Sequence, residues 1–267
     1  MARGRVFHDG TLSRPQLDHP ECVAVAPDGS VWCGGERGQL YRISPDGAEL
    51  RQVASTEGFV LGIAFAPDGR RLFACDLAHR AVFTVDTSSG AVELFADGGD
   101  RPFVTPNFPA VAADGTVYVS DSNVAGEPGG GVYRFAPDGT GGLWCAAPLN
   151  FANGLALSPD AVYVVESFLP GISRIPLTTG VPELVVTLPG TVPDGIAFGP
   201  DGRLYVGCYE PSQVLRVDAD GTVSTVLADP TAHLLCHPTN LAFRGDELFT
   251  SNLGRWHVTL IDGLSDP

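Results

Sequence analysis

The chain has 267 residues, enough for one large domain with its own core. Its 31 acidic residues outnumber 16 basic ones, and the net charge of −15 makes nucleic acid and anionic membrane surfaces poor partners. All 16 basic residues are arginines, which excludes chemistry through a lysine. The 33 glycines and 22 prolines are typical of many short strands and turns.

The N-terminal segment has no apolar core of signal-peptide length, and the sequence has no apolar run long enough to span a membrane. We therefore expect a cytoplasmic protein. The cysteines form no Cys-x-x-Cys pair, and we expect buried thiols rather than disulfides or a zinc site. They are Cys22, Cys33, Cys75, Cys145, Cys208 and Cys236.

One signature recurs six times: a short apolar run, a Pro-Asp-Gly-like turn and a second run with an aromatic residue. Such a turn predicts a hairpin, because glycine accepts a positive φ and aspartate bonds its own backbone. The copies begin, in chain order, at His19, Phe59, Thr105, Phe151, Val192 and His237.

Two weaker strand signals follow each copy, which gives four short strands per repeat of about 40–46 residues, as in a propeller blade. We predict an all-β fold, a six-bladed β-propeller with four antiparallel strands per blade, over residues 1–267 as a single domain. After the last copy the chain supplies strands over 246–251 and 256–261 and then ends. The missing outer strand would come from residues 3–8, which would close the ring.

The first strand of every propeller blade lines the central channel, so equivalent positions form a ring around the axis. An alanine recurs at the same place in all six copies. The residue three places before it is a carboxylate in two copies and a carboxamide in two others. Together they suit Ca²⁺, or Mg²⁺ or Mn²⁺ as a weaker fit. Asn-Gly and Asp-Gly pairs are also common turn formers, which is the alternative interpretation. The six residues are Glu21, Leu61, Asn107, Asn153, Asp194 and Thr239.

With these positions the whole chain resembles the family of senescence marker protein, gluconolactonase and luciferin-regenerating enzyme. The resemblance implies a catalytic divalent metal, usually calcium with magnesium, manganese or zinc as alternatives, and hydrolysis of lactones or phosphotriesters. It implies that Glu21, Asn153 and Asp194 are metal ligands and that Asn107 is a fourth ligand or a substrate contact. Thr105 stands where sugar lactonases of the family tend to carry an arginine.

Two histidines, His19 and His237, precede the axial positions in the first and last blades, which are neighbours in a closed ring. They are candidate proton carriers beside Asp194, the candidate general base, although imidazoles that cap rim loops would look the same. We expect a second shell around the ligands at the ends of the second strands, from Gly35, Asp76, Asp121, Glu166, Cys208 and Asn252.

Large apolar residues near this mouth favour a small-molecule substrate that is more apolar than a sugar acid. The expected substrate contacts are Phe59, Leu61, Thr105, Phe108, Phe151, Thr239 and Asn240.

These features predict a metal-dependent hydrolase of a lactone or small ester, with Asp194 activating water. Two alternatives stay open: a metal-dependent isomerase or cyclase of a biosynthetic intermediate, and a non-catalytic propeller that binds a ligand. No Gly-x-Ser-x-Gly elbow or phosphate-binding glycine loop is present. Both a monomer and a small homo-oligomer are compatible with the sequence.

Overall fold

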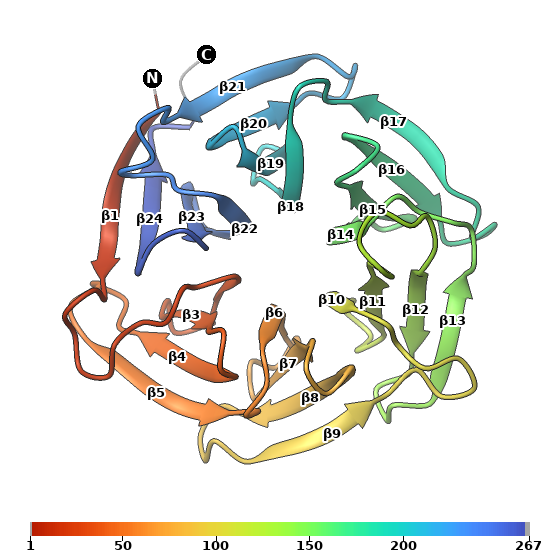
Figure 1. Ribbon diagram of the computed structural model, residues 1–267, viewed down its shortest axis with the longest axis horizontal. Coiled ribbons are helices and arrows are strands. Elements are labelled where there is room, and N and C mark those ends of the chain that lie inside the picture. Colours follow the sequence, from red (N-terminus) through yellow and green to blue (C-terminus); the bar gives the residue numbers. More distant parts are fainter. Residues whose placement is uncertain (1, 265–267) are drawn as a thin grey trace.

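The computed structural model describes residues 2–264, whereas residues 1 and 265–267 of the predicted domain lie outside the described part. Its 24 strands form six four-stranded antiparallel sheets around a central axis, which confirms the predicted propeller (Figure 1). No helix within the described range is long and apolar enough to cross a membrane.

Each sheet is one blade, whose four strands follow one another from the axis to the rim. Blades 1 to 3 consist of β2 (Val23–Val25), β3 (Val31–Gly34), β4 (Gln39–Ile43) and β5 (Leu50–Ser55); β6 (Val60–Phe65), β7 (Arg71–Asp76), β8 (Ala81–Asp86) and β9 (Val92–Ala96); and β10 (Pro106–Val111), β11 (Val117–Asp121), β12 (Gly131–Phe135) and β13 (Gly141–Cys145).

Blades 4 to 6 consist of β14 (Ala152–Leu157), β15 (Ala161–Glu166), β16 (Gly171–Pro176) and β17 (Glu183–Thr187); β18 (Val192–Phe198), β19 (Leu204–Glu210), β20 (Gln213–Val217) and β21 (Val223–Ala228); and β22 (Pro238–Arg244), β23 (Glu247–Asn252), β24 (His257–Asp262) and β1 (Arg3–Asp9).

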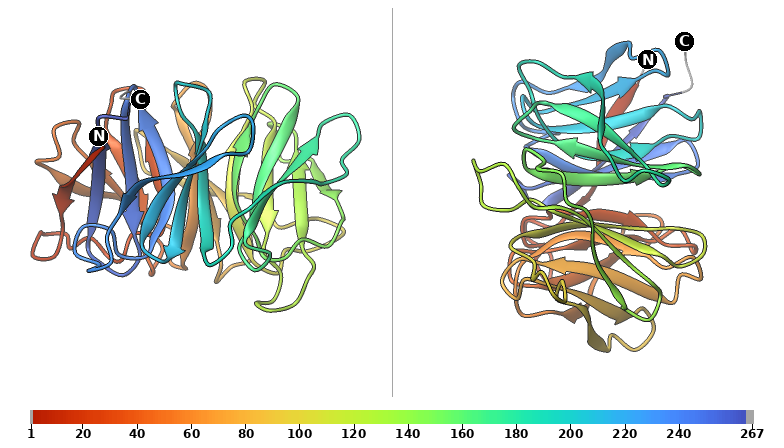
Figure 2. Two further views of the ribbon diagram at one scale, coloured as in Figure 1. Left: turned by 90° about the horizontal axis from the view of Figure 1, so that it is seen from above. Right: turned by 90° about the vertical axis from the view of Figure 1, so that its right-hand side faces the viewer.

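The Pro-Asp-Gly turns close the hairpins as their residues dictate. In the first of them, Asp28 Oδ1 accepts a hydrogen bond from the Ser30 backbone N–H at 2.9 Å, and Gly29 adopts a φ of 81°. Because the strands alternate in direction, these turns lie together on one face of the ring. The longer connections lie on the opposite face, and the side views show both faces (Figure 2).

The N-terminal strand closes the ring, as predicted. β1 pairs antiparallel with β24, from Arg3 opposite Asp262 to Asp9 opposite His257. The Phe7 side chain is buried and meets Phe249 edge-on at 4.8 Å between ring centroids. The last blade is therefore built from both ends of the chain, and its outer edge is β1.

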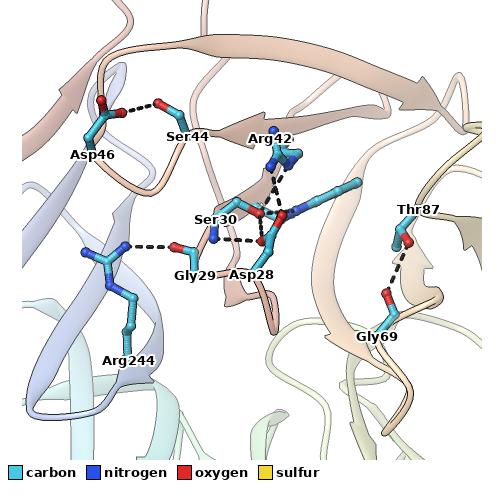
Figure 3. Close-up of polar contacts among 10 residues, drawn as sticks. Asp28, Gly29, Ser30, Arg42, Ser44, Asp46, Gly69, Thr87 and Arg244 are labelled. Atoms are coloured by element: carbon cyan, nitrogen blue, oxygen red, sulfur yellow. Dashed lines mark hydrogen bonds and ion pairs between the residues drawn. The ribbon is translucent and has the colours of Figure 1, made fainter.

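Arg244 ties this blade to blade 1 on the turn face (Figure 3). One of its guanidinium nitrogens donates to the carbonyl oxygens of Gly29 at 2.7 Å and Pro45 at 2.8 Å. The same guanidinium lies 4.7 Å from the ring centroid of Phe249. A single side chain thus bonds two turns of blade 1 while it stacks inside blade 6.

Apolar side chains fill the space between neighbouring sheets, with one buried cluster at each of the six blade junctions. The six cysteines belong to this interior or its border as free, buried thiols, as the sequence indicated. Because each junction packs two sheets face to face, the blades hold their inner strands at a fixed distance from the axis.

Candidate functional site

The inner strands bring the six equivalent positions together, and we call these residues the axial ring: Glu21, Leu61, Asn107, Asn153, Asp194 and Thr239. All six side chains are buried, at 8% exposure or less. Inner strands of neighbouring blades contact one another all the way around the ring. Polar residues that are spread over more than 200 positions of sequence thus meet at one end of the channel.

A β-bulge lies at this position in blades 2 to 6. In blade 4, Ala152 pairs with Glu166 and Leu155 with Val164, which leaves one extra residue on the inner strand around Asn153. The same shift in register surrounds the axial residue of the other four blades. A bulge turns a side chain out of the regular alternation of a strand, so it gives the axial residue a direction that the sheet alone would not.

Glycines after three axial residues allow the inner strands to approach closely. A Cβ atom on Gly154 would lie 2.7 Å from the Cα atom of Gly195, and one on Gly195 would lie 2.4 Å from the carbonyl oxygen of Thr239. A Cβ atom on Gly62 would lie 2.4 Å from the Asn107 carbonyl oxygen. The Asn-Gly and Asp-Gly pairs therefore serve strand-to-strand packing at the axis rather than a reversal of the chain.

Two serines fix the axial amides. Asn107 Nδ2 donates to Ser122 Oγ at 3.0 Å, and Asn153 Nδ2 donates to Ser167 Oγ at 3.2 Å. Each serine follows the end of a second strand in the same blade. Because the NH₂ end of the amide is held, its carbonyl oxygen points away from the serine, and Asn153 Oδ1 is buried without a hydrogen-bond partner.

The backbone at Glu21 is held from blade 6. Its carbonyl oxygen accepts hydrogen bonds from Asn240 Nδ2 at 3.0 Å, Ser251 Oγ at 3.0 Å and Thr239 Oγ1. Thr239 and Asn240, which the sequence suggested as substrate contacts, are at most 1% exposed and position Glu21 in this structure. In the carboxylate, Glu21 Oε2 is buried without a hydrogen-bond partner, and so is the amide oxygen Asn240 Oδ1.

Burial raises the pKa of both axial carboxyls, and a neighbouring charge adds to the effect at Glu21. Burial is the main cause that raises the pKa of Glu21 well above its usual range, and the charge of Asp194 adds to it. Burial likewise raises the pKa of Asp194 to about 7, against the influence of the nearby Asn153 amide. Asp194 Oδ1 also lacks a partner. Two buried acids that repel each other and have free oxygens are costly unless a cation or a proton lies between them.

The donor set fits a hard divalent cation. Glu21, Asn153 and Asp194 each present a buried oxygen without a hydrogen bond, and carboxylate and amide oxygens are the ligands that calcium takes in proteins. Among residues 2–264 no group of three or more His, Cys, Asp and Glu side chains could hold a metal. A site here therefore depends on the amide oxygens in addition to two carboxylates.

Both predicted mouth histidines have carboxylate neighbours that the sequence did not reveal. His19 Nδ1 lies 3.7 Å from Glu36 Oε1, and His237 Nδ1 lies 3.2 Å from Glu210 Oε1. Each histidine side chain is about a third exposed, at 30% and 31%. Glu36 lies just beyond the end of β3 and Glu210 is the last residue of β19, which is the only sequence signal that could have identified them.

The predicted apolar contacts divide into two groups. Leu61 and Phe108 are buried, and Phe108 belongs to the core cluster between blades 3 and 4. Phe59, Thr105 and Phe151 are half-buried. Phe151 packs against Phe168, a residue that is 51% exposed, at 4.7 Å between ring centroids. Blade 4 therefore carries exposed aromatic surface near the mouth.

Three of the six predicted second-strand ends bond the loop before the inner strand and not an axial side chain. Asp121 accepts hydrogen bonds from the backbone N–H groups of Val104 and Thr105, Glu166 from that of Asn150, and Asn252 from that of Cys236. In each of these three blades a bonded N–H group lies three residues before the axial residue. These side chains fix the loop that leads into the inner strand, whereas the serines contact the axial amides.

Two relatives of known sequence match nearly the whole chain. The chain is 26% identical to the STRICTOSIDINE SYNTHASE-LIKE 6 protein of Arabidopsis thaliana, over 94% of this chain and 81% of that protein. It is 28% identical to an L-arabinolactonase of Azospirillum brasilense, over 90% and 82% of the two chains.

A gluconolactonase structure from Xanthomonas campestris superposes with a TM-score of 0.81 at 21% identity, covering 98% of this chain and 89% of the other, and shares its fold. Residues 61–251, which include five of the six axial positions, match the SMP-30/gluconolactonase/LRE-like region. The chain belongs to the SMP-30/gluconolactonase/LRE-like family.

Proposed function

We propose that the protein is a divalent-metal-dependent hydrolase of lactones or small esters, with calcium as the metal. The observation that carries the proposal is the set of buried oxygens of Glu21, Asn153 and Asp194 that meet at the axis without hydrogen-bond partners. Family membership and the similarity to an L-arabinolactonase support lactones as the substrate class.

Glu21, Asn153 and Asp194 would hold the cation, with Asn107 as a further oxygen donor. A divalent cation bound there would polarise the carbonyl group of an ester. Asp194 takes a proton from the attacking water as a general base. As the ring C–O bond breaks, the leaving oxygen regains a proton and a hydroxy acid forms. The mouth histidines are the candidates for that proton transfer.

The substrate is proposed to carry an apolar substituent. Phe151 and the exposed Phe168 provide an aromatic surface beside the axial ring, and Thr105 offers no positive charge to a sugar acid. Apolar surface at the mouth of a site contributes binding energy in proportion to the area that a ligand covers. A lactone with an alkyl chain should therefore be preferred to a polyhydroxylated one.

The test is turnover of γ-nonalactone, γ-butyrolactone and glucono-δ-lactone by metal-free protein with and without added Ca²⁺. We expect calcium-dependent hydrolysis, fastest for γ-nonalactone. Asp194→Asn should fold normally and lose about 10²–10⁴-fold in rate, because an amide accepts no proton from water. Asn153→Ala should regain part of its activity in excess calcium. Near wild-type turnover by Asp194→Asn, or turnover that ignores chelation, would contradict the mechanism.

A second candidate function uses the same cation site for a reaction other than hydrolysis. The similarity to a synthase-like protein favours an enzyme that rearranges or joins a carbonyl substrate at the same carboxylates. Hydrolysis in ¹⁸O-labelled water separates the two, because only hydrolysis places the label in the product acid.

A further inference from the structure

His237 occupies a conformation that the surrounding structure holds in place. It has a φ of 50°, in the left-handed region that residues other than glycine seldom adopt. Its backbone N–H donates to Ser212 Oγ at 3.1 Å, and its carbonyl oxygen accepts from the Leu253 N–H at 3.2 Å. Strained backbone that is fixed on both sides is a feature of functional sites, and here it determines where the imidazole lies.

The imidazole is fixed as well, by Tyr209 of the neighbouring blade. The two rings stack with centroids 4.3 Å apart at an interplanar angle of 20°. His237 Nδ1 lies 3.1 Å from the Tyr209 carbonyl oxygen and 3.2 Å from Glu210 Oε1. Gly254 leaves room for the ring, since a Cβ atom there would lie 2.8 Å from His237 Cδ2.

These contacts determine the tautomer. A carbonyl oxygen can only accept a hydrogen bond, so Nδ1 must carry the proton. In the neutral ring Nε2 then holds the lone pair and is the atom that can take up a proton. Glu210 is 55% exposed, so water screens its charge and the backbone carbonyl is the stronger determinant.

His19 shares the left-handed backbone, with a φ of 38°, but its ring is not held in the same way. Its nearest carboxylate oxygen is 3.7 Å away, and its ring meets the edge of Trp256 at 4.6 Å. Within residues 2–264 its ring nitrogens make no hydrogen bond to a backbone carbonyl. The two mouth histidines are therefore unequal, although their sequence positions are equivalent.

Tyr209 also connects His237 with the axial carboxyls. Burial raises the pKa of the Tyr209 hydroxyl, and the charges of Glu21, Glu210 and Asp194 raise it further. Strand pairing gives the geometric link, since Cys208, next to Tyr209, pairs with Pro193, next to Asp194. His237 lies two residues before the axial Thr239, whose Oγ1 donates to the Glu21 carbonyl oxygen. The imidazole therefore lies at the same end of the channel as the two axial carboxyls.

We propose that Tyr209 is a positioning residue that holds His237 with Nδ1 protonated, so that Nε2 of His237, and not His19, carries the proton of the reaction. The inference rests on the proposed hydrolysis. The proton that Asp194 takes from water passes to Nε2 and then to the leaving oxygen as the ring C–O bond breaks. Asp194 and His237 both return to their starting states.

Two experiments test this. The first needs no substrate: ¹⁵N NMR of the histidines in the folded wild-type chain, assigned with His237→Ala. We expect the neutral His237 ring to be protonated at Nδ1 in the wild type and in Tyr209→Phe. Tyr209→Ala keeps the backbone carbonyl but removes the stacked ring, so the imidazole should turn away from that carbonyl and populate both tautomers. A wild-type His237 protonated at Nε2 would overturn the positioning role.

The second is hydrolysis of γ-nonalactone in calcium. His237→Ala should lower kcat by about 10²-fold or more with little change in KM, and added imidazole should restore part of it. Tyr209→Ala should lower kcat about threefold to tenfold, and Tyr209→Phe should recover most of that loss. His233→Ala, an exposed histidine on the same loop, is the matched control and should leave kcat unchanged.

A loss in His19→Ala as large as that in His237→Ala would overturn the assignment of His237 as the proton carrier, as would an unchanged kcat in His237→Ala. If the wild type hydrolyses none of the lactones, the proposed function fails, and the proton-carrier role fails with it. The NMR result then still decides whether Tyr209 sets the tautomer.

Discussion

At the scale of single residues, the axial site is made by short polar side chains that hold one another. Ser122 and Ser167 each bind the NH₂ group of one axial amide, and Ser251 binds the carbonyl oxygen of Glu21. A serine hydroxyl both donates and accepts, so it can satisfy an amide and a neighbouring carbonyl together, as Ser122 does with the Ala152 carbonyl oxygen at 2.6 Å. One oxygen of each axial carboxylate is left without a hydrogen-bond partner.

The free carboxyls predict that the metal-free protein loses stability as the pH rises. The folded pKa of Asp194 is about 7, whereas an unfolded aspartate ionises near pH 3.9. Between these pH values the unfolded chain has released a proton that the folded chain keeps. Each rise of one pH unit in this range therefore lowers the free energy of unfolding. The loss is complete above the folded pKa and is on the order of a few kcal/mol for this group.

Thermal unfolding in EDTA should therefore give a higher Tm at pH 5 than at pH 8, and Ca²⁺ at pH 8 should restore the difference. Asp194→Asn should flatten the dependence, while Asp100→Asn, a change on an exposed loop, should leave it in place. A metal-free Tm that does not fall between these pH values would show that the axial acids are not destabilising when ionised.

The repeat in the sequence located the axial residues, but the shell around them was misassigned. Ligand contacts were expected from the strand-end acids Asp121 and Glu166, whereas the next residue in each case, Ser122 or Ser167, makes them. Neighbouring residues at a strand end point to opposite sides, so an error of one position moves a side chain from the axis to the loop. Alignment of the copies cannot show which of the two neighbouring residues faces the axial amide, because the bulge in the inner strand decides it.

At the scale of strands, β1 performs two tasks: it supplies the outer edge of blade 6 and it brings Phe7 onto Phe249. The sequence predicted this strand because the last repeat is one strand short, and the pairing confirms it. The bulges in the inner strands were not predicted, since a glycine within a strand pattern indicates either a bulge or a turn and only the packing of the next blade decides between them.

Deletion of residues 1–8 should expose the edge of β24 and remove Phe7 from the core. The loss of a buried phenylalanine contact alone costs about 3–5 kcal/mol, and an unpaired edge promotes association between chains. We expect a lower Tm and aggregation in size-exclusion chromatography. Val6→Ser, a change on the exposed side of the same strand, serves as the control. A monomeric truncation with an unchanged Tm would contradict the structural role of β1.

At the scale of the whole molecule, the two faces of the ring differ in the segments that they carry. One face gathers the Pro-Asp-Gly turns, and the other gathers the long connections (Figure 2). The axial ring lies toward the second face, because the axial residues stand at the starts of the inner strands. Blade 6 must join blade 1 on both faces, through Arg244 at the turns and through Thr239, Asn240 and Ser251 at Glu21. The junction between the first and last blades is thus secured at opposite ends of the channel.

Arg244→Ala should weaken this junction from the turn face. Its hydrogen bonds to Gly29 and Pro45 and its contact with the Phe249 ring together predict a loss of roughly 2–4 kcal/mol in the free energy of unfolding, measured by urea denaturation. Arg134→Ala, which removes a comparable contact with Tyr118 at 5.9 Å within one blade, should cost less. Equal losses would mean that the inter-blade bonds add nothing.

The carbonyl oxygen of Glu21 is the point where the two ends of the repeat array meet, and Glu21 is also a proposed ligand. A chain with five blades folded and the sixth undocked would already have Asn153 and Asp194 in place, but its Glu21 would be unsupported. A cation would bind weakly to that intermediate and tightly to the finished ring, and would add its binding free energy only to the latter. Cation binding would then stabilise the fully docked propeller relative to every partly assembled form.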